Sequence, residues 1–260
     1  MPQKVTSLLA IDIGNTNTVV GLFKNSKLAQ SWRLTTVRER TSDEHGVLVK
    51  NLLELSGYDH LKMDGIAISC VVPPLLPSIR QMATTYFGCE PFVVQPGIKT
   101  GMPILYEHPQ EVGADRIVNA VAGFQKYGGP CIVIDLGTAT TFDAVSGKGE
   151  YLGGIIAPGI LISAEALFQR AAKLPRVEIK EPSEVIGRNT VSAIQSGIFY
   201  GYIGLIEKIV SLLKVEQGDS TITIATGGLV PLISKRTSCI QHTEPDLILQ
   251  GLQILYDMNQ

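Results

Sequence analysis

The chain has 260 residues, of which 45% are hydrophobic and 18% are charged, and its formal net charge is -2. This composition excludes a disordered or collagen-like chain and, at about 150 residues per domain, leaves room for one large or two small domains. The 22 basic residues are balanced by 24 acidic ones. We therefore expect no nucleic-acid partner, because such proteins gain their affinity by neutralising phosphates with an excess of positive charge.

No segment of the sequence predicts a membrane span or a disulfide framework. The longest apolar stretch, residues 152–167, is interrupted by glycines and Pro158, and it is shorter than the roughly 20 apolar residues that cross a bilayer. The N-terminus lacks the apolar region and cleavage site of a signal peptide. The cysteines are far apart, without the spacing of a zinc site; they are Cys70, Cys89, Cys131 and Cys239. We expect a cytoplasmic protein with reduced thiols.

The first half of the chain alternates predicted strands and helices. Residues 7–23 hold two apolar, β-rich runs joined by a short turn of Gly, Asn and Thr residues, which predicts a β-hairpin. Hydrophobic spacing and turn residues predict the elements that follow: a strand at 28–34, a helix at 43–56, a strand at 65–72, a helix at 76–87 and a strand at 91–94. This alternation favours an α/β layer fold.

The second half repeats the opening pattern. After a predicted helix from Gly113 to about Tyr127, residues 131–145 again give an apolar strand, an acid, a Gly and hydroxyl-rich turn and a second apolar strand. The acid Asp135 lies 135 − 12 = 123 positions after Asp12, close to half the chain, which indicates a duplicated domain. The later predicted elements are a strand at 151–156, helices at 160–172 and 192–213, a strand at 221–225 and a helix at 246–257.

The repeat suggests a division into two domains, residues 1–118 and 119–260. No linker is visible between the halves, so the boundary near residue 118 is soft. The last helix is a candidate to pack back on the first domain.

The two Gly and hydroxyl-rich turns have the composition of phosphate-binding loops. Glycine lets the backbone come close to a ligand, and Asn and Thr supply hydrogen-bond donors to phosphate oxygens. A single turn of this kind is also ordinary hairpin chemistry. Two copies at half-chain spacing, with Thr226-Gly227-Gly228 ending a later strand, favour a protein that grips a nucleoside triphosphate from both sides. The chain has neither a G-x-x-x-x-G-K-[ST] nor a G-x-G-x-x-G motif, which leaves P-loop, Rossmann and protein-kinase folds without support.

This architecture resembles the actin, hexokinase and Hsp70 superfamily, and further motifs resemble one family within it. These motifs are Lys99 to Pro103, Glu111-Val112-Gly113-Ala114-Asp115-Arg116, Asp135 to Asp143, Tyr151 to Gly154, Arg170 to Pro175 and Ile186 to Thr190. They are similar to those of type III pantothenate kinases and run along the whole chain. Cys70 stands where we would expect a second Ser, a conservative change that we interpret as structural.

The resemblance implies a fold and an activity. The implied fold is α/β, with two ribonuclease-H-like (actin-like) domains, each a mixed sheet with flanking helices, and ATP in the cleft between them. The implied reaction is the ATP-dependent phosphorylation of pantothenate to 4′-phosphopantothenate, the first step of coenzyme A biosynthesis. The implied cofactors are ATP, Mg²⁺ and a monovalent cation, K⁺ or NH₄⁺, and the implied assembly is a homodimer.

The resemblance also implies roles for individual residues. Asp115 would be the general base, and Asp135 would be the acid that serves the monovalent cation. The ATP phosphates would be contacted by Asp12, Ile13, Gly14, Asn15, Thr16, Asn17, Thr18, Val19 and Thr138. The pantothenate site would comprise Tyr106, Gly113, Ala114, Asp115, Arg116 and Thr190.

The residues by themselves leave several of these roles open. Asp115 is alternatively a helix-terminal acid that favours the helix dipole and pairs with Arg116. Arg116 is equally suited to a substrate carboxylate or to a surface ion pair. Thr190 fits an N-cap, and Tyr106 fits a half-buried turn. Because Mg²⁺ relies on few carboxylates and on substrate phosphates, Asp12 and Asp135 are both candidates for its acid.

Two other functions compete with the kinase. A non-enzymatic regulator would keep the fold and lose activity, and the presence of Asp115, Asp135 and both turns argues against it. Another phosphotransferase or a phosphatase of the same superfamily, such as a sugar kinase, would be expected to be longer and to lack Gly113-Ala114-Asp115-Arg116.

Overall fold

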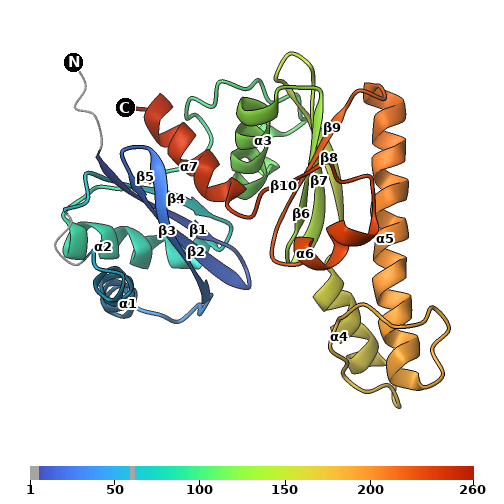
Figure 1. The fold of residues 1–260 in the computed structure, drawn as a ribbon. Helices are drawn as coiled ribbons and strands as arrows, with labels where there is room; N and C mark the ends of the chain where they lie inside the picture. The colour runs from blue at the N-terminus through green and yellow to red at the C-terminus, as the bar shows by residue number, and fades with distance from the viewer. Residues whose placement is uncertain (1–5, 59–61) are drawn as a thin grey trace. The chain divides into compact units, whose positions relative to one another are not determined.

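A computed structural model describes residues 6–58 and 62–260 and divides the chain into two compact units (Figure 1). The first unit holds the described residues up to Gly101 together with Glu107–Ala122 and Leu247–Gln260. The second holds Met102–Tyr106 and Gly123–Asp246. Each unit has its own five-stranded mixed sheet, which confirms the α/β class expected from the sequence.

The sheet of the first unit has the strand order β3-β2-β1-β4-β5. Strands β1, β2 and β3 form an antiparallel meander, and β4 and β5 continue from β1 in parallel. The strands are β1 (Ser7–Ile13), β2 (Asn17–Lys24), β3 (Lys27–Thr35), β4 (Gly65–Cys70) and β5 (Phe92–Val93). The helices of this unit are α1 (Ser42–Leu55), α2 (Leu76–Phe87) and α7 (Leu247–Met258), with most of α3 (Ala114–Tyr127).

The two faces of this sheet differ in side-chain size. On one face, large residues such as Leu9, Ile11 and Ile68 pack against α1 and α2 in a buried core. On the other face, glycines let α7 lie directly on the strands. A Cβ atom added to Gly21 would stand 2.7 Å from Leu249 of α7, and one added to Gly65 would stand 2.0 Å from the Tyr256 hydroxyl. The last helix therefore belongs to the first sheet.

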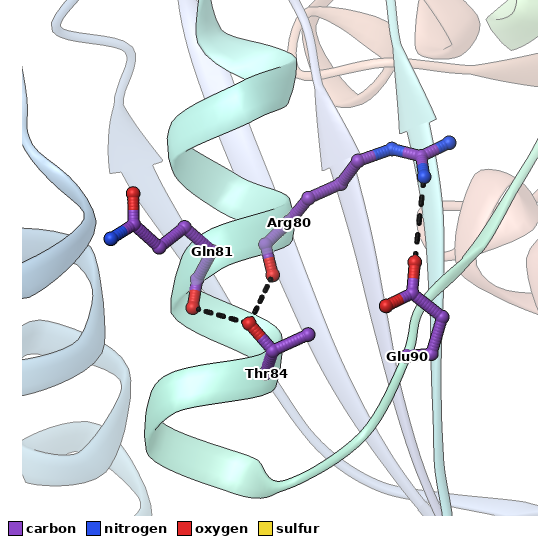
Figure 2. A network of polar contacts seen from close by, with 4 residues as sticks. All are labelled: Arg80, Gln81, Thr84 and Glu90. Atoms are coloured by element: carbon purple, nitrogen blue, oxygen red, sulfur yellow. Dashed lines mark hydrogen bonds and ion pairs between the residues drawn. The ribbon is translucent and has the colours of Figure 1, made fainter.

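Helix α2 ends in a defined set of polar contacts (Figure 2). The single hydroxyl proton of Thr84 is shared between the carbonyls of Gln81 and Arg80, at 3.0 and 3.3 Å. Arg80 is also 3.5 Å from Glu90, in the segment before β5. Gly88 then ends the helix in the left-handed conformation at φ 66°, where glycine carries no steric cost. Gly88 thus ends α2 before the chain reaches β5.

The sheet of the second unit has the order β8-β7-β6-β9-β10, with the same pattern of parallel and antiparallel pairs as the first. Its strands are β6 (Cys131–Leu136), β7 (Ala139–Val145), β8 (Tyr151–Pro158), β9 (Ile222–Thr226) and β10 (His242–Thr243). Its helices are α4 (Ile160–Arg170), α5 (Thr190–Gln217) and α6 (Val230–Ile233). The shared topology agrees with the duplication predicted from the 123-residue spacing.

The long helix α5 supplies much of the second core. Phe199, Tyr202 and Ile206 pack with Ile134 and Phe142 of the sheet. The C-terminal part of α3 lies against Val133 and Ile224, where Gly123 permits close approach; an added Cβ would be 2.8 Å from Val133. Residues that alternate along β6 thus bury both faces of the sheet.

The predicted elements are all present, with end-point differences of a few residues. Helix α5 is longer than predicted at both ends, because Asn189 caps it at its N-terminus and its last turns continue to Gln217. The short elements β10 and α6 were not predicted. No helix in the described ranges 6–58 and 62–260 is long and apolar enough to cross a membrane.

Candidate active site

The first turn lies between β1 and β2 and is closed by backbone and hydroxyl contacts. Asp12 is the penultimate residue of β1, paired with Val19 of β2 and Ser69 of β4. The Gly14 N–H donates to the Asn17 carbonyl at 3.0 Å. Asn15 and Thr16 at the tip are exposed. The turn therefore follows a buried strand and presents backbone and side-chain donors at its exposed tip, where a ligand could accept them.

A threonine after β3 supports this turn from behind. The Thr36 hydroxyl donates to the Gly14 carbonyl at 2.8 Å and lies 2.9 Å from the Thr18 hydroxyl. The Thr36 N–H donates to the Thr16 carbonyl at 3.0 Å. Arg38 reaches the side-chain oxygen of Asn15 at 3.5 Å. Thr36 was not predicted as a site residue, since a single Thr after a strand carries no recognisable sequence signal.

The second turn, between β6 and β7, is the counterpart of the first in the second unit. Asp135 is again the penultimate residue of its strand, paired with Thr141 and with Thr226. The Gly137 N–H donates to the Ala139 carbonyl at 3.1 Å, and Thr138 is exposed at the tip. The second turn is one residue shorter than the first, because the flanking pair Leu136 and Thr140 is closer in sequence than Ile13 and Thr18.

Gly159 lies against the second turn. A Cβ atom added there would stand 2.0 Å from the Thr138 carbonyl oxygen and 2.7 Å from that of Gly137. Only glycine permits this backbone approach.

Oxygen atoms gather around Gly227, at the end of β9. A Cβ atom added to Gly227 would stand 2.7 Å from both the Oδ1 atom of Asp135 and the Leu136 carbonyl oxygen. Gly227 also has φ 104°, a conformation that other residues rarely adopt. The Thr226-Gly227-Gly228 motif thus lies directly beside Asp135 and the second turn, as parallel pairing of β6 and β9 requires.

Asp115 lies in the first turn of α3 and is half-buried. Its Oδ1 atom accepts a 2.8 Å hydrogen bond from the Arg116 backbone N–H, a contact that suits an acid in the first turn of a helix. Burial raises the pKa of the Asp115 carboxyl, while the N–H and charge of Arg116 oppose that rise. A raised pKa suits a general base that works near neutral pH.

The neighbours of Asp115 fit closely around it. A Cβ atom added to Gly113 would be 2.5 Å from the Oδ1 atom of Asp115, so glycine is needed for the carboxylate to fold back over the chain. The Arg116 side chain is only 7% exposed. This burial excludes the surface ion pair as the environment of Arg116, and a buried guanidinium is costly unless it is paired.

Tyr106 belongs to the second unit, where it packs on the sheet through a neighbouring tyrosine. Its ring centroid is 6.4 Å from that of Tyr151, with an interplanar angle of 55°. A Cβ atom added to Gly153 would be 3.6 Å from the Tyr106 ring. Tyr106 is half-buried, which matches both the turn-residue interpretation and an aromatic wall.

Thr190 lies at the start of α5, in a groove of about 770 Å³ lined by Leu167, Leu174, residues 187–190, Ala193, Ile194, Gly197 and Ile198. The N-cap of α5 is Asn189, whose side chain accepts from the Ser192 N–H at 2.9 Å. The interpretation of Thr190 as the N-cap is therefore wrong. Thr190 is exposed, and the groove lining includes neither Asp135 nor Thr138.

The structure groups the predicted residues by unit. The first unit holds Asp12 to Val19 and Gly113 to Arg116. In the second unit, Asp135, Thr138 and the Thr-Gly-Gly turn lie at the C-terminal ends of β6 and β9, and Tyr106 and Thr190 lie on other elements. Cys70 ends β4, where its thiol donates to the Val72 carbonyl at 3.2 Å.

Comparisons with known proteins identify the family of this chain. The family model of type III pantothenate kinase matches residues 8–212. A type III pantothenate kinase of Geobacter sulfurreducens is 53% identical over 253 residues, covering 97% of this chain and 99% of the relative. One from Koribacter versatilis is 52% identical over 263 residues, covering 97% and 96%.

Solved structures show the same fold at low sequence identity. A Baf family protein from Campylobacter jejuni has a TM-score of 0.60 at 19% identity, with 96% of this chain and 98% of that chain covered. With the two sheets, the paired turns and the matches along nearly the whole length in place, the chain belongs to the type III pantothenate kinase family.

Proposed function

We propose that this chain phosphorylates pantothenate with ATP, using the two Gly and hydroxyl-rich turns for the ATP phosphates and Asp115 as general base. Pantothenate kinase activity and ATP use are those of the family. The observation that supports the residue roles best is the matched placement of Asp12 and Asp135. Each is the penultimate residue of the central strand of its sheet and is followed by an open turn.

In this proposal the two turns bind the ATP phosphates with backbone N–H groups and side-chain hydroxyls. The tips at Asn15, Thr16 and Thr138 are exposed and carry N–H and hydroxyl donors, which suit phosphate oxygens. The remaining residues of the first loop, Asp12 to Val19, hold the tip in place through the strand pairs. Phosphoryl transfer depends largely on such positioning and on charge neutralisation.

Asp115 would accept the proton of the pantothenate hydroxyl as the γ-phosphoryl group is transferred. Its raised pKa, caused by burial, increases its strength as a base. The positive charge of the adjacent Arg116 would attract the pantothenate carboxylate, for which a planar guanidinium is well suited. Tyr106, Gly113, Ala114 and Thr190 complete the proposed substrate site.

The proposed Mg²⁺ and monovalent cation fit the oxygen atoms of this chain. The Asp135 Oδ1 atom and the Leu136 carbonyl oxygen would each stand 2.7 Å from a Cβ atom on Gly227, and oxygen donors are those that hard cations prefer. Among the described residues no group of three or more His, Cys, Asp or Glu side chains forms a metal cage. A proposed Mg²⁺ site would need only one or two carboxylates together with the substrate phosphates, whose charge the ion would neutralise. Asp135 would hold the K⁺ or NH₄⁺.

We extend the proposal to a homodimer in the cytoplasm. Apolar side chains on α4 and α5 are exposed, among them Leu161, Val191 and Val215, and an apolar surface of this kind is typical of a subunit interface. The four cysteines are free thiols, which suits a reducing compartment.

A coupled ADP-release assay tests the proposed reaction. Purified protein is incubated with ATP, Mg²⁺ and K⁺. The rate of ADP release is then compared between reactions that contain pantothenate, no acceptor or one of a panel of sugars. We expect ADP release that depends on pantothenate. Turnover on a sugar but not on pantothenate would indicate another phosphotransferase, and no turnover with any acceptor would favour a non-enzymatic regulator.

A further inference from the structure

A buried tyrosine hydroxyl joins α5 to the end of β8. Tyr202 of α5 is 8% exposed, and its hydroxyl donates to the Pro158 carbonyl at 2.8 Å. The Ser163 hydroxyl of α4 lies 2.5 Å from the same Tyr202 oxygen. Since the tyrosine has one hydroxyl proton and gives it to Pro158, Ser163 must be the donor in the second bond. The chain of hydrogen bonds therefore runs from Ser163 to Tyr202 to Pro158.

The backbone that Tyr202 holds lies against the second turn. Pro158 pairs with Ala139, the first residue of β7 and the one that follows the turn. Gly159 follows, and its Cα lies so close to the turn that an added Cβ would be 2.0 Å from the Thr138 carbonyl oxygen. The Ser163 N–H donates to the Gly159 carbonyl at 3.0 Å. The hydroxyl of Tyr202 and the start of α4 thus fix the segment that supports the turn.

We propose that Tyr202 is a positioning residue for ATP binding. Its hydroxyl holds Pro158 and Gly159 against the turn at Gly137 and Thr138, and so keeps the donors of that turn aimed at the ATP phosphates. In this role Tyr202 acts through the turn, because its hydroxyl is engaged by Pro158 and Ser163. This inference rests on the proposed role of the second turn in ATP binding. The effect of one hydroxyl is large enough to measure, because displacements of about 1 Å weaken positioned ligands strongly.

A purely structural role would have a different signature. Tyr202 packs in the core of the second unit with Phe199 and Ile134, so loss of a hydrogen bond there also lowers stability. Tyr127 is a matched control in the same unit. Its hydroxyl donates to Glu244, and neither residue belongs to the second turn. Tyr127→Phe therefore removes a tyrosine hydrogen bond without touching the support of that turn.

The experiment compares Tyr202→Phe with Tyr127→Phe in the full-length protein. For each we would measure KM for ATP and for pantothenate, kcat, the Kd of ATP by calorimetry, and the Tm. We expect Tyr202→Phe to raise the KM and Kd of ATP about fivefold or more, because a turn that is no longer held in place binds the phosphates less tightly, with little change in the KM for pantothenate. We expect Tyr127→Phe to lower the Tm without changing the constants for ATP.

Ser163→Ala gives a second test, because Ser163 acts through Tyr202. We expect it to weaken ATP binding less than Tyr202→Phe, and the double variant Ser163→Ala/Tyr202→Phe to be no worse than Tyr202→Phe alone. ATP constants of Tyr202→Phe that stay within about twofold of wild type, with a Tm loss like that of Tyr127→Phe, would overturn the proposal. Additive losses in the double variant would overturn it as well.

The proposed function and the role of Tyr202 fail separately. A wild-type protein that binds ATP but leaves pantothenate unchanged contradicts the proposed substrate alone, since the Kd of ATP in the variants still decides the role of Tyr202.

Discussion

Gly227 lies directly against the carboxylate of Asp135, so that a Cβ atom added to Gly227 would stand 2.7 Å from Oδ1. At this distance the carboxylate must move or the turn must shift, and the φ of 104° adds strain for any other residue. We predict that Gly227→Ala lowers kcat/KM by about tenfold or more, because correct placement of catalytic groups carries much of the rate. Steady-state kinetics and the Tm of the purified variant would measure this loss.

The adjacent Gly228 provides the control for that variant. A Cβ atom added to Gly228 would have nothing within 4 Å. We expect Gly228→Ala to retain near-normal activity. Equal losses in both variants would show that the turn as a whole, rather than the contact with Asp135, is sensitive to substitution.

Asp135→Ala should abolish the dependence of activity on a monovalent cation. In the proposed site this carboxylate is the acid that serves K⁺ or NH₄⁺, and the Leu136 carbonyl oxygen beside it would not compensate for the lost charge. The measurement is the rate in K⁺, NH₄⁺ and Na⁺ buffers at equal ionic strength. Wild-type rates that are the same in sodium alone would count against the assignment.

Asp115→Asn should fold normally and lose phosphoryl transfer by about 10²-fold or more, the usual contribution of a general base. The amide keeps the shape of the side chain and still accepts a hydrogen bond from the Arg116 N–H, but it cannot take a proton. Circular dichroism would check the fold, and single-turnover kinetics would isolate the chemical step. Near-normal turnover would remove Asp115 from this role.

The pH dependence of the wild-type rate should reflect the raised pKa of Asp115. A base must be deprotonated to act, so kcat/KM should fall as the pH drops through that pKa, at a higher pH than for an ordinary aspartate. We predict that Arg116→Gln moves this acid limb to still higher pH, because the positive charge of Arg116 lowers the pKa of Asp115 and the variant removes that charge. An acid limb that stays in place in this variant would contradict the coupling.

His45 should make the first unit sensitive to acid. It is 5% exposed on α1, and burial, with the nearby charge of Arg40, lowers its pKa from 6.5 to about 4. The folded state therefore binds fewer protons than the unfolded state, and stability present above about pH 6.5 is lost as the pH falls towards 4. At about 1.4 kcal/mol per pKa unit, the expected loss is on the order of 3 kcal/mol.

Denaturant unfolding at several pH values would measure this loss. His45→Leu should flatten the slope between pH 6.5 and 4, whereas His108→Leu, at an exposed position, should leave the slope as in the wild type. A slope that is unchanged in His45→Leu would assign the acid sensitivity to other groups.

Local patterns predicted most of the fold. Alternating apolar residues and turn signals located the hairpin of β1 and β2, and the recurrence of the pattern after Asp135 predicted a second sheet. The short strand β10 was missed because two residues, His242 and Thr243, show no periodicity. Its pairing with β9 depends on the tertiary fold.

The sequence predicted site residues only in segments whose composition is characteristic and recurs along the chain. The turns at Asp12 and Asp135 have a visible composition. Thr36 and Gly159 support those turns from distant segments, and a lone Thr or Gly has many ordinary explanations. Thr190 shows the same limit. Asn and Thr are both common N-cap residues, so the sequence could not show that Asn189 and not Thr190 caps α5.

The most direct test of the central claim is identification of the product. Wild-type protein and Asp115→Asn are incubated with ATP, Mg²⁺, K⁺ and pantothenate, and the acceptor is analysed by mass spectrometry and ³¹P NMR. The account predicts a phosphate monoester on the pantothenate hydroxyl with the wild type and little or none with the variant. ATP consumption with unmodified pantothenate, or equal product from both proteins, would contradict it.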